Sequence, residues 1–164
     1  MLLKDNEIKR SSGILMPIFT LPSPYGIGTL GKASRDFINF LQASNQSWWQ
    51  ILPVGPTSYG DSPYQSPSTH AGNPYFIDLD EFIDMGLLTK KECESTHFGS
   101  NDKINYSLLY ENRLPLLFKA YKNSEISENA EFIKFCKNNK WLLDYSLFMA
   151  LKEHFNGKPW YEWD

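Results

Sequence analysis

The chain has 164 residues, of which 41% are hydrophobic and 21% are charged, and its formal net charge is -3 at pH 7. This length is sufficient to bury a core, either as one domain or as part of a larger one. The mild charge argues against a nucleic-acid partner, which requires a basic surface, and against a disordered acidic chain.

Neither the start of the chain nor its cysteines indicate export. Residues 1–10 are polar and lack the apolar stretch of a signal peptide. No run approaches the roughly 18 apolar residues of a membrane span. Cys93 and Cys136 lie far apart without the paired spacing of a metal or redox site, so we expect free thiols. We therefore predict a cytoplasmic protein with no membrane partner.

The first third of the chain predicts a strand, a helix and a second strand. The apolar run 13–19 fits a buried strand, although Pro17 argues against a central position in a sheet. A loop rich in proline and glycine follows at 21–31, and apolar residues at helical spacing predict an amphipathic helix at 32–43. The run 48–54 again fits a buried strand. This order is typical of a parallel βαβ unit.

A long loop without periodicity follows from 55 to 74. Loops of this length are uncommon in compact domains and are usually functional or disordered. Its tyrosines, Tyr59 and Tyr64, and its prolines argue against disorder. A short extended segment is predicted at 75–79.

The second half is predicted to be mainly helical. Helical segments are expected at 80–88, 105–122, 129–138 and 141–155. Pro115 should kink or delimit the second of them. Ser127 is a candidate N-cap for the third, and Gly157 should terminate the fourth.

The segment 26–31 matches the dinucleotide-binding pattern G-x-G-x-x-G and lies between a predicted strand and a predicted helix. That pattern also needs an acidic residue at the end of the second strand, but the run 52–56 contains none. Residues 20–25, with two prolines, also separate the first strand from the first glycine. We therefore interpret these glycines as sites of close backbone packing and expect no nucleotide cofactor.

The segments 60–66 and 71–75 carry hydroxyls, an amide, a carboxylate and aromatic rings. They follow the carboxyl end of a predicted strand, where α/β proteins place their active sites. Sugars need this mixture, because rings cover their apolar C–H faces and polar groups bind their hydroxyls. A rigid structural loop stiffened by proline remains an equal alternative.

The remaining polar residues suggest no complete catalytic site. Asp61, Asp78 and Asp80 could supply paired carboxylates for glycoside chemistry, but solvated or capping roles are favoured. The three histidines lie far apart and without metal-ligand spacing, at 70, 97 and 154. No Ser-centred nucleophile elbow is present.

Several longer motifs point to a known family. The first is the run of residues 12–31, which contains Tyr25-Gly26-Ile27-Gly28. The others are residues 49–57, 60–66, 71–74, 144–152, 159–160 and 163. Together these segments resemble the amylomaltase family of 4-α-glucanotransferases from about residue 10 onward. Two departures concern loop detail: Asn45 stands where the family usually has glycine, and 67–70 replaces a more apolar stretch.

The resemblance implies an α/β protein that contains the start of a (β/α)8 barrel, with a mainly helical insertion. It implies transfer of α-1,4-glucan segments to the 4-hydroxyl of an acceptor by a retaining covalent mechanism, with no cofactor. Maltooligosaccharides and related α-1,4-glucans are the expected partners, and no obligate protein partner is expected.

The barrel expected from the resemblance is incomplete in this chain. Residues 1–80 would hold the first βα units with the substrate loop at 55–75, and residues 81–164 the helical insertion. The family's catalytic aspartates and glutamate are expected beyond Asp164, so no catalytic residue is assigned here. A complete barrel needs at least about 200 residues.

The resemblance also implies substrate-binding residues. Tyr64 would line the donor sugar subsite, with Asp61 and Ser62 flanking the same loop. Tyr59 and Tyr106 would contribute to a second surface that contacts glucan. The alternative function is a non-catalytic maltooligosaccharide-binding protein.

Overall fold

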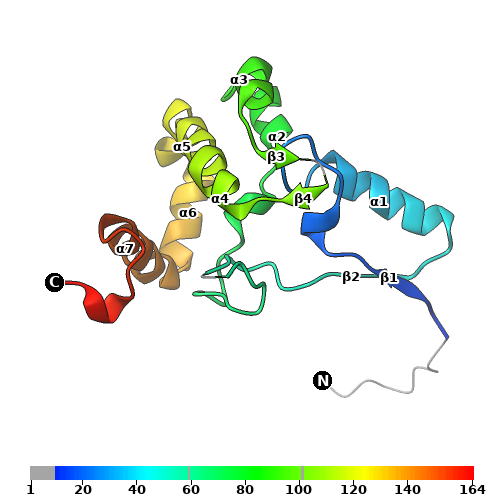
Figure 1. Cartoon of the computed structure of the whole chain (residues 1–164), viewed down its shortest axis with the longest axis horizontal. Helices are drawn as coiled ribbons and strands as arrows, with labels where there is room; N and C mark the ends of the chain where they lie inside the picture. Colours follow the sequence, from blue (N-terminus) through cyan, green and yellow to red (C-terminus); the bar gives the residue numbers. More distant parts are fainter. Residues whose placement is uncertain (1–9, 59, 101) are drawn as a thin grey trace.

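The computed structural model describes residues 10–58, 60–100 and 102–164, and it combines helices with short strands. In Figure 1 the helix α1 lies on one side of the molecule and α5, α6 and α7 lie on the other. Between them lie the strands, a long loop and residues 21–31, which are called the glycine-rich segment below. Within the described residues, no helix is long and apolar enough to cross a membrane.

The predicted βαβ unit is confirmed. The strands β1 (Gly13–Leu15) and β2 (Trp48–Gln50) pair in parallel, with Gly13 opposite Trp48, and α1 (Lys32–Ala43) connects them. The helix has the bounds expected from its periodicity. Phe37 of α1 packs edge to face on Trp49 of β2 with ring centroids 5.1 Å apart, which holds the helix on the strand pair.

Both strands are shorter than the apolar runs that predict them. The amide of Met16 still donates to the carbonyl of Gln50 over 3.0 Å. Pro17 then supplies no donor, and Ile18–Thr20 turn into a 3-10 helix. The second run also contains a proline, Pro53, but β2 already ends at Gln50, three residues before it.

The glycine-rich segment packs closely on the turn that follows β1, as the sequence predicts. The amide of Gly28 donates to the carbonyl of Phe19 over 3.1 Å. A Cβ added at Gly28 would lie 2.1 Å from the carbonyl oxygen of Ile18, closer than any real contact. Gly26 adopts a φ of 79°, which favours glycine. This segment is a tightly packed connection.

The extended segment predicted at 75–79 is wrong. Pro74–Phe76 form a 3-10 turn and α2 (Leu79–Asp84) begins directly after it. Two side chains start these turns, because Asn73 accepts from the amide of Tyr75 and Asp78 accepts from the amide of Asp80. Local capping therefore overrides the extended pattern.

Three small elements between α2 and the longer helices were not predicted. The helix α3 (Lys90–Ser95) starts with a capping box, in which Thr89 and Glu92 bond each other's backbone amides. The strands β3 (Gly99–Ser100) and β4 (Lys103–Ile104) form an antiparallel pair.

The helix predicted at 105–122 is a continuous helical segment with a wider turn inside it. It consists of α4 (Tyr106–Leu108), a π-helical segment (Leu109–Arg113) and α5 (Leu114–Asn123). Pro115 lies in the first turn of α5, where its missing amide and its ring are tolerated. Pro115 thus delimits α5, as expected.

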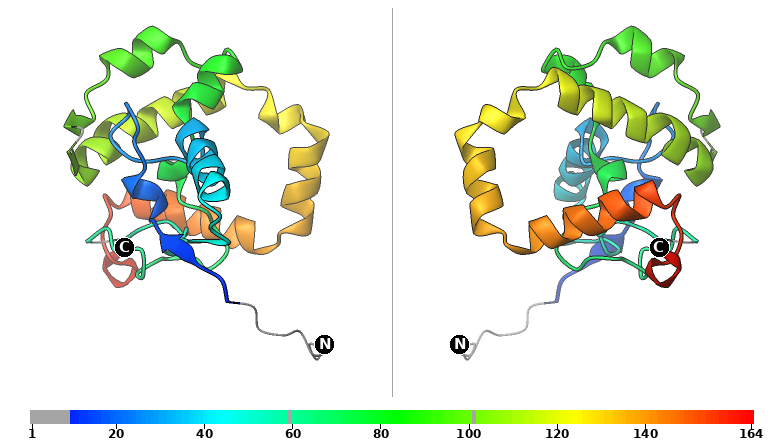
Figure 2. Two further views of the ribbon diagram at one scale, coloured as in Figure 1. Left: turned by 90° about the vertical axis from the view of Figure 1, so that its right-hand side faces the viewer. Right: turned by 90° about the vertical axis from the view of Figure 1, so that its left-hand side faces the viewer.

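The last two helices, α6 (Ala130–Asn138) and α7 (Trp141–His154), agree with the predicted ranges. The predicted N-cap of α6 is wrong, because Asn129 accepts hydrogen bonds from the amides of Glu131 and Phe132. Ser127 lies instead in a preceding 3-10 turn. Figure 2 shows α5, α6 and α7 following one another along an arc at the periphery.

One buried cluster joins the two halves of the chain. From the first half it includes Ile18, Tyr25 and Ile27, and from the helical half Leu109 and Leu116. Tyr25 packs edge to face on Phe98, with ring centroids 6.1 Å apart. The helical half therefore packs directly on the glycine-rich segment. Both cysteines are free, Cys93 being buried and Cys136 half-buried.

Candidate functional site

The candidate site is the loop of residues 55–73, called the 55–73 loop below, which leaves the carboxyl end of β2 and lies between β2 and α7 in Figure 1. A hydrogen bond closes its base, as the amide of Asn73 donates to the carbonyl of Val54 over 2.8 Å. Ser66 packs onto Gly55, where an added Cβ would lie 2.6 Å from Ser66 Oγ. The base of the loop is therefore fixed.

Serine side chains hold the loop's own backbone. Ser62 Oγ accepts from the amide of Tyr64 over 3.3 Å, and Ser66 Oγ donates to the carbonyl of Ser68 over 2.7 Å. Ser68 Oγ accepts from the amides of His70 and Ala71 over 3.2 and 3.1 Å. These local turns give the loop a defined shape without a packed core beneath it.

The structure places four of the five predicted binding residues. Tyr64 is 72% exposed, so its ring faces solvent, whereas Ser62, Asp61 and Tyr106 are half-buried. Asp61 adopts a φ of 52°, a left-handed conformation that aspartate tolerates in turns. Tyr59, the fifth, lies outside the described residues.

Asp61 lies close enough to Tyr75 and Tyr106 to influence the acidity of both. Burial, followed by the negative charge of Asp61, raises the pKa of Tyr75 to about 12 and that of Tyr106 above its ordinary value. Burial also raises the pKa of Asp61, and the side chain of Thr57 opposes this shift. The rings of Tyr75 and Tyr106 are 6.3 Å apart. The structure therefore brings together Asp61 and Tyr106, which lie far apart in the sequence.

The other two aspartates considered for catalysis have structural partners. Asp78 caps α2 and accepts a hydrogen bond from Thr29 Oγ1 over 2.9 Å. Asp80 accepts from the hydroxyl of Tyr25 over 2.6 Å. Burial, followed by this carboxylate, raises the pKa of Tyr25 above its ordinary value. The capping role favoured by the sequence is confirmed for Asp78.

Arg113 is a buried residue that the sequence did not single out. Its Nη1 donates to the carbonyl of Tyr25 over 3.1 Å and its Nη2 to that of Ile77 over 2.6 Å, while Nε finds no partner among the described residues. Burial lowers its pKa to about 10. An arginine in a helical pattern usually indicates a solvated face, so no sequence signal marked this one.

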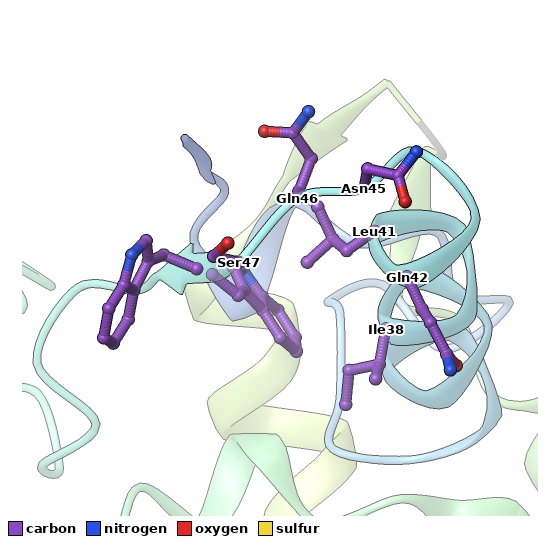
Figure 3. A pocket seen from close by; sticks show the side chains of 8 residues that line it. Ile38, Leu41, Gln42, Asn45, Gln46 and Ser47 are labelled. Atoms are coloured by element: carbon purple, nitrogen blue, oxygen red, sulfur yellow. The ribbon is translucent and has the colours of Figure 1, made fainter. Parts of the chain in front are cut away.

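A shallow hollow lies at the opposite end of β2 from the candidate loop (Figure 3). It is lined by the carboxyl end of α1, the turn after it and the first residues of β2, including Leu41, Gln46 and Ser47. It contains no titratable side chain. The hollow therefore carries no chemistry of its own.

A parallel strand–helix–strand unit, followed by a fixed aromatic loop at the carboxyl end of the second strand, defines an α/β protein with a candidate ligand-binding loop. The sequence pattern described as 4-alpha-glucanotransferase matches residues 16–164. The chain belongs to the 4-alpha-glucanotransferase family.

Relatives of that name are similar along almost the whole chain. The 4-alpha-glucanotransferase of Clostridium butyricum is 50% identical over 151 residues, covering 91% of this chain and 31% of the relative. The 4-alpha-glucanotransferase of Thermus thermophilus is 43% identical over 162 residues, which cover 96% of this chain and 32% of that relative. The solved amylomaltase from Streptococcus agalactiae in complex with acarbose has a TM-score of 0.87 and 42% identity, with coverage of 95% and 32%. The chain thus spans about a third of the length of these proteins.

Proposed function

We propose that this chain is part of a 4-α-glucanotransferase, which moves α-1,4-glucan segments to the 4-hydroxyl of an acceptor glucan or glucose. The observation that carries the proposal is the match of residues 16–164 to this family, with half of the aligned residues identical to a named relative. The solved neighbour that binds acarbose supports an α-glucan as the ligand.

The fold that we propose for the whole protein is a (β/α)8 barrel, of which β1, α1 and β2 are the first elements. Residues 1–80 would belong to the barrel and residues 81–164 to a helical insertion. The parallel pairing of β1 with β2 supports this proposal. In such barrels the loops after the strands form the active site, which gives the 55–73 loop its role.

In the reaction that we propose, a carboxylate outside these 164 residues forms a bond to the anomeric carbon of the donor glucan. A carboxylic acid protonates the departing glycosidic oxygen as its bond to this carbon breaks. The oxygen of the acceptor's 4-hydroxyl then attacks the same carbon and displaces the first carboxylate, and its proton returns to the acid/base group. The carboxylate that forms the bond to the donor is an aspartate, and another aspartate stabilises the charged transition state. No cofactor takes part in this chemistry.

The described residues would bind the glucan. The exposed ring of Tyr64 would cover one sugar face at the donor subsite, and Asp61 and Ser62 would shape the loop beside it. Tyr106, with Tyr59, would contact glucan at a second surface. The carboxylate of Asp61 can accept a hydrogen bond from a sugar hydroxyl.

Transfer kinetics on maltotriose with the full-length gene product test this proposal. Tyr64→Ala should lower kcat/KM by about tenfold to a hundredfold, because a loosely held donor sugar reacts slowly. Tyr161→Ala is the matched control, since Tyr161 is 70% exposed elsewhere on the chain. Equal losses in both variants would contradict the role of Tyr64. A wild-type protein that binds maltotriose without forming longer or shorter glucans would instead be a non-catalytic binding protein.

A further inference from the structure

One aromatic contact joins the 55–73 loop to a distant helix. The imidazole of His70 stacks on the indole of Trp141, with ring centroids 5.4 Å apart and planes 27° from parallel. His70 belongs to the arm of the loop that returns to Asn73, and Trp141 is the first residue of α7. The contact therefore bridges the loop and the helical half of the chain.

Neighbouring residues in its own part of the chain hold each of the two stacked residues in place. The indole Nε1–H of Trp141 donates to Asn139 Oδ1 over 3.1 Å, and the ring of Tyr145 lies 6.0 Å away. The backbone amide of His70 donates to Ser68 Oγ. His70 is exposed, so the stack is a surface contact between two positioned rings and no part of the buried core.

We propose that the stack of His70 on Trp141 is a clasp that holds the returning arm of the 55–73 loop against α7 and thereby positions Tyr64. The functional part of this inference rests on the proposed glucan transfer. His70 and Trp141 are positioning residues, because they act through the loop and not on the substrate.

The shape of the loop explains why the clasp matters. The base is fixed by Asn73 on Val54 and by Ser66 on Gly55. The hydrogen bonds of the arm at 67–72 described above come from Ser66 and Ser68 and stay within the loop, whereas the stack connects the arm to another element. Releasing the stack would free the arm, which follows Tyr64 in the chain, and leave the base in place.

Hydrogen exchange of the full-length gene product tests the clasp without reference to activity. His70→Ala and Trp141→Leu should each speed amide exchange at residues 68–72 by about twofold to tenfold, the range for one aromatic pair. The double variant should add nothing, because both changes remove one contact. His70→Phe should restore slow exchange, since it keeps a stacked ring.

Matched controls lie elsewhere on the chain. His97→Ala removes an exposed imidazole, and Trp160→Leu removes an indole that is 69% exposed. Both should leave exchange at residues 68–72 unchanged. In transfer assays on maltotriose, His70→Ala should lower kcat/KM by a similar twofold to tenfold, and His70→Phe should recover it.

The outcomes separate the two proposals. Unchanged exchange at residues 68–72 in both single variants overturns the clasp, whatever the activity. Faster exchange with normal transfer kinetics overturns its role in positioning Tyr64. Faster exchange in a protein whose wild type transfers no glucan supports the clasp and contradicts the proposed function.

Discussion

Single residues in this protein connect segments that lie far apart in the sequence. Asp78 both starts α2 and accepts a hydrogen bond from Thr29, and Asp80 holds the hydroxyl of Tyr25. Arg113 then contacts the carbonyl of Tyr25 itself. The glycine-rich segment is therefore fixed by side chains from two later parts of the chain, the start of α2 and the π-helical segment.

Gly28 offers a direct test of this close packing. Gly28→Ala should destabilise the protein by about 1 to 3 kcal/mol, because the new methyl group would overlap the backbone of Ile18 and Leu21. Gly72→Ala is the control, since nothing lies within 4 Å of a Cβ added there. Thermal melting should give a lower melting temperature for Gly28→Ala than for Gly72→Ala. An equal change in the two would show that the segment is free to move.

At this scale the sequence predicted local roles better than long-range ones. It anticipated the tight packing of the glycines, and it favoured solvated or capping roles over catalytic ones for the aspartates that include Asp78. It did not anticipate Arg113 or the stack of His70 on Trp141, because each joins positions with no common local pattern. The separate positions of Asp61 and Tyr106 likewise gave no hint that they meet.

The elements follow the sequence where caps and periodicity agree. The helix α1 has its predicted bounds and α7 differs at its end by one residue, because both carry long apolar patterns. Both strands are shorter than the apolar runs that predict them, and Pro17 limits the first of them directly. The helix α3 escaped prediction because its six residues include one buried side chain, Cys93, and no repeating apolar face.

The carboxylate of Glu92, in the capping box of α3, predicts that the protein becomes less stable in acid. Hydrogen bonds from Lys119 and then Thr89 lower the pKa of Glu92 to about 2. A carboxylate with a lowered pKa stabilises the fold above its ordinary pKa of about 4.5, and this contribution is lost as the pH falls toward 2. The melting temperature of Glu92→Gln should therefore be lower than that of the wild type at neutral pH and should change less between pH 4.5 and 2.

A matched control for this prediction lies on the same helix. Glu94 forms an exposed ion pair with Lys90 at 3.6 Å, a kind of contact that contributes little. Glu94→Gln should therefore leave the melting temperature near that of the wild type at neutral pH. Parallel acid profiles for Glu92→Gln and the wild type would contradict the role of the Glu92 carboxylate and its contact with Lys119.

At the scale of the whole molecule, the helical arc leaves apolar surface uncovered. No residue of α6 or α7 is fully buried in the part of the chain that the structure describes. Leu143 and Leu147, one helical turn apart on α7, are 74% and 58% exposed. A helix that is apolar on several faces is usually buried in its complete protein, and the relatives are about three times as long as this chain.

The 164-residue chain on its own should therefore bind a fluorescent dye that recognises apolar surface. Replacing Leu143 and Leu147 together by lysine should reduce the dye signal. Ser146→Lys adds a single lysine at an exposed polar position of α7 and should leave the signal unchanged. A weak signal in the unsubstituted chain would mean that these side chains are covered by the chain itself.

The position of Arg113 also bears on the order in which the chain folds. Its hydrogen bond to Tyr25 spans 88 positions of the sequence and its hydrogen bond to Ile77 spans 36. The strands β1 and β2, in contrast, pair across a single helix. Closing the loop between Tyr25 and Arg113 costs more entropy than pairing Gly13 with Trp48, so the βαβ unit can form before that hydrogen bond. At roughly 5–20 residues per second of synthesis, Arg113 leaves the ribosome about two to seven seconds after Ile77. During that interval the carbonyls of Tyr25 and Ile77 lack the guanidinium that bonds them in the folded chain, and its arrival completes the joint between the two halves.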